Sequence, residues 1–268
     1  MTTVALAHRA QWPVVPVLAA KEARRLVTHP ATLVGWGLLA FMFAVNVADA
    51  ESISAFDMVT TGPTFYPGLF CVLAAHMVTT RDQRAGGGEL VGSVPATRQQ
   101  RVLALLVAAS IPALIALGLN VAIRAYFVWQ DVYVEAPGVG HVIQGPVTVL
   151  GGALLGIMLG LWLPQRVVPV LAMVVLVAGS VALSSDENGA GTYFGPLVSW
   201  VDWGPYEGRA WYALEAGSPG AHVVYLLGMT GLAGCAAWLR VARLRWPALA
   251  LSAAFLALAI WGGVTQLP

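Results

Sequence analysis

The feature that most constrains this chain is a series of long apolar runs separated by short polar segments. A membrane-spanning helix needs about 20 mostly apolar residues, because the hydrocarbon core of a bilayer is about 30 Å thick. Of the 268 residues, 58% are hydrophobic and only 10% are charged, whereas a soluble domain carries about 25% charged residues. The sequence therefore predicts an all-α, polytopic membrane protein and excludes a soluble globular domain.

Seven apolar runs are long enough to be considered as spans. They cover approximately residues 31–48, 62–80, 102–123, 147–163, 167–183, 222–239 and 247–264. The segments at 49–61 and 124–146 carry acids, glycines and prolines, so we expect them to be connections. The last run is only just long enough to cross. We therefore expect a six-helix core and an additional C-terminal span.

Basic and acidic residues are concentrated in alternate polar segments of the chain. With the amino terminus inside, the cytoplasmic segments hold every one of the 14 basic residues except Arg124 and Arg209. All 13 acids except Glu22, Asp82 and Glu89 then lie outside. Because cytoplasmic loops carry an excess of Lys and Arg, this predicts a cytoplasmic amino terminus. The excess of arginine over lysine is typical of a GC-rich bacterial genome, so we expect a bacterial cell membrane.

Residues 14–29 have the pattern of a short amphipathic helix. Basic residues Lys21, Arg24 and Arg25 fall on one face, and Ala19, Ala23, Leu26 and Val27 fall on the other. A basic face with an apolar back suits a helix lying in the membrane surface. The alternative is a positively charged flank of the first span. Residues 1–29 are thus expected to form a cytoplasmic tail and an amphipathic surface helix.

A polar segment at residues 81–101 divides the second run from the third. It holds four arginines and three consecutive glycines, Gly86 to Gly88. Such a segment cannot lie in lipid, because its backbone groups would find no hydrogen-bond partners there. Thr97 and Gln100 have the spacing of a capping box and predict the start of the next helix.

Residues 86–98, Gly-Gly-Gly-Glu-Leu-Val-Gly-Ser-Val-Pro-Ala-Thr-Arg, carry a resemblance to a known family. They resemble the cytoplasmic segment between the second and third spans of type-2 ABC exporter permeases. The amphipathic lead-in that ends at Pro30 is similar to that family as well, as is a six-span body with a large outer segment. The chain departs from the family at Gly87, Gly88 and Gly92, where glycine lowers helix propensity.

The resemblance implies a six-span permease domain over residues 30–245, followed by the additional span at 246–268. It implies a partner permease, identical or similar, and a dimer of ATP-binding-cassette ATPase subunits. Residues 81–101 would dock on the ATPase as a coupling loop. The residues expected to make this contact are Arg81, Arg84, Glu89, Leu90, Val91, Val94, Pro95, Arg98 and Arg101. For any single arginine, the competing interpretation is a topology signal without contact.

The chain itself shows no catalytic pattern. No Gly-x-x-x-x-Gly-Lys-Ser/Thr loop occurs in the sequence, so ATP and Mg are expected on the partner ATPase and no cofactor on this chain. Cys71 and Cys235 lie in separate apolar runs and are expected to be buried side chains rather than a disulfide. The histidines are scattered and predict no metal site; His76 is expected to be buried or snorkelling. No nucleic-acid partner is expected.

The longest segment between runs, residues 184–221, interleaves aromatic and acidic side chains. This composition is typical of short helices at the outer membrane interface. We expect an outer lid formed by Trp200, Trp203, Tyr206 and Trp211, and the alternative is an aromatic belt without a gating role.

Glycines recur every four residues in the fourth run, at Gly152, Gly156 and Gly160. This spacing allows two helices to approach closely. The contact lies either within the chain or between two copies, and the sequence leaves both open.

Two functions remain. The first is the permease subunit of an exporter that moves an amphipathic, lipid-like, peptide or drug-like substrate across the bilayer to the outside. The second is a non-transporting anchor or assembly subunit of a larger membrane complex. An ion-coupled transporter is disfavoured, because no acidic or basic residue lies in the middle of a run.

Overall fold

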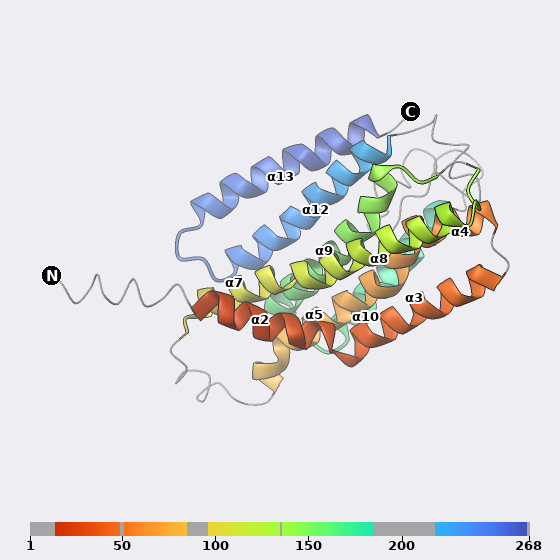
Figure 1. Ribbon diagram of the computed structural model, residues 1–268. Helices are drawn as coiled ribbons and strands as arrows, with labels where there is room; N and C mark the ends of the chain where they lie inside the picture. Colours follow the sequence, from red (N-terminus) through yellow and green to blue (C-terminus); the bar gives the residue numbers. More distant parts are fainter. Residues whose placement is uncertain (1–13, 49–50, 85–95, 135, 185–217, 267–268) are drawn as a thin grey trace.

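The computed structural model describes residues 14–48, 51–84, 96–134, 136–184 and 218–266. The described residues form helices and no strand, and six helical segments are long and apolar enough to cross a membrane (Figure 1). The chain is a membrane protein with transmembrane helices, as its composition predicted.

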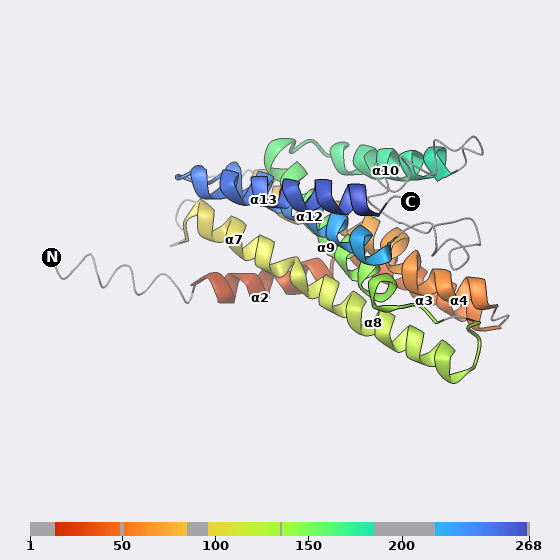
Figure 2. The same ribbon diagram turned by 90° about the horizontal axis from the view of Figure 1, so that it is seen from above.

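The helices of the described residues are α2 (Val14–Val27), α3 (Pro30–Ala48), α4 (Ser52–Thr60), the π-helical turn η1 (Thr64–Gly68), α5 (Leu69–Arg84), α7 (Arg98–Ala108), α8 (Ser110–Trp129), α9 (Val139–Trp162), α10 (Val168–Ser184), α12 (Pro219–Leu239) and α13 (Trp246–Thr265). The six candidate spans are α3, α4 to α5, α7 to α8, α9, α12 and α13. The candidate spans lie along a common direction, and α4 continues into α5 as α7 continues into α8 (Figures 1 and 2).

All seven predicted runs lie on helices, but the fifth differs in length. Helix α10 has 17 residues and belongs with the shorter apolar helices. The predicted seventh run is α13, with 20 residues, so the six long spans include the helix that was expected to be an addition. The expected six-span core thus contains five long spans and α10.

Two segments that were expected to be connections are helical. Residues 52–60 form α4 in spite of the acid Asp57, because Phe56 and Val59 are buried in the bundle. Residues 139–146 form the first two turns of α9 and include Pro146. In each case burial in the bundle outweighs the local signals of acids and prolines.

Helix α9 lies at the centre of the bundle, against α5, α8 and α12. Its three spaced glycines face α5 and η1: a Cβ at Gly152 would meet the carbonyl oxygen of Gly68, and one at Gly156 would meet that of Val72. At Gly160 an added Cβ would lie 2.9 Å from Thr79 Cβ. The glycine contact that the sequence left open is therefore a contact within the chain.

Helices α12 and α13 form an antiparallel pair at one side of the bundle (Figures 1 and 2). They approach closely at Gly228, which lies against the backbone of Ala259, and at Gly262, which lies against the backbone of Tyr225. Most of the remaining side chains of α13 are exposed, as expected for a helix that faces lipid.

The basic residues gather at one end of the bundle, which we call the basic end. Here α5 ends, α7 begins, and the turns between α9 and α10 and between α12 and α13 are found; Gln99 Nε2 donates to the Val241 carbonyl oxygen across 3.1 Å. The described basic residues of this end are Lys21, Arg24, Arg25, Arg81, Arg84, Arg98, Arg101, Arg166, Arg240, Arg243 and Arg245. The opposite end holds the α8–α9 connection. The charge separation follows the predicted pattern, and its orientation in the cell stays a prediction.

Candidate functional site at the basic end

A charged cluster joins α2 to the last turn of α5. Arg81 donates two hydrogen bonds to the Glu22 carboxylate, from Nη1 to Oε2 at 2.7 Å and from Nη2 to Oε1 at 2.8 Å. Glu22 is only 5% exposed. A bidentate arginine–carboxylate pair is among the strongest and most directional hydrogen-bonded contacts in proteins. The last turn of α5 is thereby held in a fixed position on α2.

Two further residues complete this group, which we call the Glu22 cluster: Glu22, Arg25, Arg81 and Asp82. Arg25 Nη1 donates to Glu22 Oε1 at 2.8 Å, and Arg81 Nε donates to Asp82 Oδ1 at 3.1 Å. The buried carboxylate is thus shared by two guanidinium groups, which offset the cost of removing its charge from water. Arg25 and Arg81 were predicted as a membrane-surface residue and a coupling residue, and both are engaged within the chain.

Helix α2 places its apolar face on the bundle. Ala19, Ala23 and Leu26 are buried, and the helix packs against α7 and α5. The basic residues Lys21 and Arg24 are exposed. The helix predicted over residues 14–29 is therefore present, but protein covers the face that was expected to enter lipid. Its position at the membrane surface stays a prediction.

The predicted coupling residues divide between described and undescribed segments. Arg84 folds back on its own helix and donates from Nη2 to the Met77 carbonyl oxygen and from Nε to the Thr80 carbonyl oxygen. Arg98 is exposed at the start of α7, and Arg101 is half-buried one turn later. Lying outside the described residues are the coupling residues Glu89, Leu90, Val91, Val94 and Pro95 and the lid residues Trp200, Trp203, Tyr206 and Trp211.

The start of α7 is fixed by the capping box that the sequence predicted. The Gln100 backbone N–H donates to Thr97 Oγ1 at 3.2 Å, and the Thr97 backbone N–H donates to Gln100 Oε1 at 2.8 Å. Each side chain satisfies a backbone donor that the first helical turn leaves without an intrahelical partner. In the sequence, residues 85–95 therefore connect α5, whose last turn is bonded to α2, with α7, which packs against α2.

A histidine that the sequence did not single out forms the junction between α2 and α3. His29 Nδ1 accepts a hydrogen bond from the Ala31 backbone N–H at 3.2 Å, which caps the first turn of α3. Burial and the nearby positive charge of Arg84 lower the pKa of His29. The signal in the sequence was an acceptor side chain directly before Pro30, at the position where a helix cap is expected.

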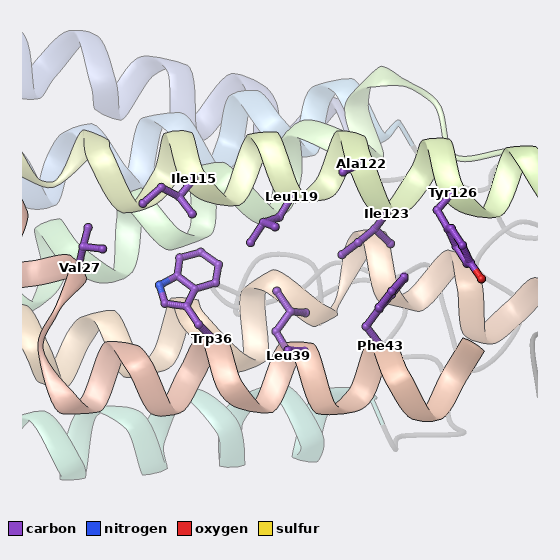
Figure 3. A pocket seen from close by; sticks show the side chains of 10 residues that line it. Val27, Trp36, Leu39, Phe43, Ile115, Leu119, Ala122, Ile123 and Tyr126 are labelled. Atoms are coloured by element: carbon purple, nitrogen blue, oxygen red, sulfur yellow. The ribbon is translucent and has the colours of Figure 1, made fainter. Parts of the chain in front are cut away.

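An apolar groove runs between α3 and α8, from the junction at Val27 to Tyr126 (Figure 3). We call it the α3–α8 groove; its volume is about 510 Å³. Helix α3 contributes Trp36, Leu39, Ala40 and Phe43, and helix α8 contributes Ile115, Leu119, Ala122, Ile123 and Tyr126. Apart from the indole nitrogen and the phenol oxygen, every side chain of the wall is hydrocarbon.

Polar side chains inside the bundle join helices to one another. His76 is buried, as the sequence suggested, and its Nε2 lies 3.0 Å from the Leu163 carbonyl oxygen. Asn120 Nδ2 donates to the carbonyl oxygens of Val59 and Val142 at 2.8 and 2.9 Å. Contacts of this kind between neighbouring spans stabilise helix packing. They give no sign of a catalytic arrangement.

The described residues also contain no group of three His, Cys, Asp or Glu side chains that could hold a metal ion. Both cysteines are buried and unpaired, as their separate positions in the sequence predicted. Comparison of the chain with protein-family models, with curated proteins and with solved structures found no match. The basic end and the α3–α8 groove are therefore interpreted from their own residues.

Proposed function

We propose that this chain is the membrane-spanning permease subunit of an ABC exporter, with its basic end in the cytoplasm and a separate ATPase as its energy source. The proposal rests on the resemblance of residues 86–98 to the coupling segment of type-2 exporter permeases. The observation that supports it most is the bidentate contact of Arg81 with Glu22, because through this contact a movement of the segment would be transmitted from α5 to α2.

Residues 85–95 follow α5 directly and lead into the capped start of α7. A partner that moves this segment would displace the last turn of α5, which Arg81 holds on α2. Helix α2 continues into α3 through the His29–Pro30 junction. Movement at one cytoplasmic loop would thus reach α3, α5 and α7 together. An exporter permease needs this kind of coupling, since its own chain does not hydrolyse ATP.

The subunit would work in pairs, as a homodimer or with a similar permease, on two ATPase subunits. The walls of the spans are mainly apolar, and the sequence places no acid or base in the middle of a run. Such surfaces favour an amphipathic, lipid-like, peptide or drug-like substrate over an inorganic ion. Transport would run outward, from the basic end to the opposite end.

Co-purification tests the proposal most directly. The chain would be co-expressed with each candidate ATP-binding-cassette ATPase of the same genome, extracted in detergent and isolated by a tag on the chain. Glu89→Lys and Leu90→Asp should each abolish stable ATPase binding, because they place the wrong charge or a carboxylate in the docking contact. Leu244→Asp is the matched control, since Leu244 is 70% exposed at the same end but in the α12–α13 turn.

Binding that is lost in the first two variants and kept in Leu244→Asp would support the coupling loop. Substrate-stimulated ATP hydrolysis in liposomes would be the next measurement. If no ATPase binds the wild-type chain, the exporter proposal fails and the anchor or assembly subunit becomes the better interpretation.

A further inference from the structure

The α3–α8 groove has the size of a small apolar ligand site. Its volume of about 510 Å³ falls in the range of about 300 to 1,000 Å³ that ligand pockets occupy. Along α8 it extends from Ile115 to Tyr126, which corresponds to about 16 Å of helix. A helix of that length, about 10 Å across, would need about 1,200 Å³. The groove is therefore too small to enclose a helix but suits an extended hydrocarbon chain.

One end of the groove lies at the edge of the membrane. Val27, the last residue of α2, lines that end (Figure 3), and the α3 span begins three residues later at Pro30. The length of about 16 Å is close to half of a hydrocarbon core about 30 Å thick. A hydrocarbon chain of a lipid that enters beside Val27 would thus extend through the leaflet at the basic end.

Two exposed cations lie on α2, the helix whose last residue lines this end of the groove. Arg24 is three residues before Val27 and borders it on the helix surface. Lys21 is three residues before Arg24 and borders Arg24 in the same way, about 120° around the helix from Val27. Both are exposed, and neither forms an ion pair with another described residue. Arg25 and Arg81, by contrast, are paired with Glu22. On α2, the positive charge that no carboxylate neutralises therefore comes from Lys21 and Arg24.

A polar atom also lies in the groove wall without a partner. The Trp36 Nε1–H group is buried and donates to no acceptor among the described residues, and in Figure 3 the indole nitrogen is on the side toward Val27. A buried donor of this kind is costly unless an acceptor reaches it. An ester carbonyl at the junction of a headgroup and its acyl chain would supply that acceptor after a small rotation of the side chain.

We propose that the α3–α8 groove binds one acyl chain of an anionic phospholipid from the leaflet at the basic end, with the lipid phosphate on Lys21 and Arg24. The apolar wall contacts the acyl chain, and the two unpaired cations bind the headgroup. Trp36 lies at the junction between the headgroup and the acyl chain. The inference does not depend on the proposed export activity, because it applies equally to an anchor subunit.

Lipid retention tests the proposal on the full-length chain. The purified protein would be incubated in mixed micelles holding equal amounts of phosphatidylglycerol and phosphatidylcholine with the same acyl chains. After removal of excess lipid, native mass spectrometry would count the lipids kept per chain. We expect one phosphatidylglycerol, with a preference over phosphatidylcholine on the order of tenfold, given two cations near the headgroup.

Two pairs of variants separate the headgroup contact from the chain contact. Lys21→Gln with Arg24→Gln should remove the preference for the anionic lipid, whereas Arg243→Gln with Arg245→Gln removes the same charge from the α12–α13 turn and should keep it. Ala40→Trp fills the groove and should abolish retention. Val34→Trp adds the same bulk to α3 at an exposed position outside the groove and should retain the lipid.

Equal retention of the two lipids by the wild-type chain would overturn the proposal, and this comparison needs no variant to fold. Unchanged retention in a folded Ala40→Trp protein would overturn it as well. Should the spectra show two associated chains that separate in Ala40→Trp but not in Val34→Trp, the groove would be a contact between copies and the lipid assignment would be wrong.

Discussion

Arg81 on α5 and Glu22 on α2, 59 positions apart in the sequence, meet through two hydrogen bonds of 2.7 and 2.8 Å. The contact changes the interpretation of Arg81, which the sequence placed among residues that touch a partner. Both terminal nitrogens of its guanidinium group are already used inside the chain. Its contribution to a partner contact is to hold the end of α5 in place.

The first prediction concerns this pair. Arg81→Ala leaves the buried Glu22 carboxylate with Arg25 as its remaining partner, and we expect a loss of about 1–3 kcal/mol in unfolding free energy. The expected cost lies below the usual 3–5 kcal/mol for breaking a buried pair, because Arg81 is more than a third exposed and partly screened by solvent. Thermal or denaturant unfolding in detergent would measure it.

A double-mutant cycle of Glu22→Ala and Arg81→Ala should give a coupling energy well above that of Glu22 with Arg25. The second pair is an i, i+3 contact on one helix and is expected to contribute about 0.2–0.5 kcal/mol. Equal coupling in the two cycles would contradict the view that Arg81 fixes α5 on α2.

The second prediction concerns the glycine contact between α5 and α9. Gly156→Ala would place a Cβ against the Val72 carbonyl oxygen and 2.9 Å from Ala75 Cβ, so we expect destabilisation of about 1–3 kcal/mol from overpacking. At Gly37 on α3 nothing lies within 4 Å of an added Cβ, and Gly37→Ala should stabilise by up to about 1 kcal/mol.

The decisive result is that glycine-to-alanine substitution lowers stability at Gly156 and raises it at Gly37. Thermal unfolding midpoints of both variants in the same detergent would measure the two changes. A neutral or stabilising Gly156→Ala would mean that α5 and α9 are further apart than described.

The third prediction is a dependence of stability on pH at the α2–α3 junction. Because the pKa of His29 is lowered from 6.5 in the folded chain, the unfolded chain binds the proton first as the pH falls. The stability that neutral His29 contributes is complete above pH 6.5 and declines below it toward the folded pKa. Protonated His29 can no longer accept the hydrogen bond from Ala31.

His29→Asn provides the comparison, since asparagine is a good helix cap and does not titrate. Unfolding midpoints of the two proteins should agree at pH 7.5 and separate below pH 6.5, with the wild type becoming the less stable one. Parallel pH profiles would exclude His29 as the source of the effect.

The fourth prediction concerns orientation. In a Cys71→Ala, Cys235→Ala background, Val134→Cys should react with an impermeant maleimide in intact cells, since Val134 is 76% exposed in the α8–α9 connection. Leu244→Cys, at the basic end, should react only after permeabilisation. Thr265→Cys, at the exposed last residue of α13, should behave like Val134→Cys, because α13 starts at the basic end and is long enough to cross. The opposite pattern would invert the proposed topology.

The spans could be predicted from sequence because the bilayer imposes a length and a composition on each of them. The start of α7 was predictable for a similar reason, since the Thr97 capping box is a local pattern. Helix α4 was missed because Asp57 suggested a connection, whereas burial of Phe56 and Val59 decides the structure there. Local signals were reliable where no tertiary contact opposed them.

The candidate sites were less predictable because they combine distant segments. Glu22 looked like one acid within a basic helix, and nothing in its neighbourhood points to Arg81. The α3–α8 groove depends on the distance between two helices that are separated in the chain by α4, η1, α5 and α7. The spacing of Gly152 and Gly156 predicted a close approach to another helix, but only the fold identifies that helix as α5.

The glycine-lined seam between α5 and α9 has a mechanical consequence. The backbone of α9 lies close to the carbonyl oxygen of Gly68 at Gly152 and close to that of Val72 at Gly156. The next glycine on this face of α9 lies one turn away, so a slide of α9 along α5 restores the close approach only after a full turn of about 5.4 Å. The two helices can therefore slide past each other only in discrete steps. Gradual movements of the bundle are expected at α3, α10 and α13, where fewer side chains are buried.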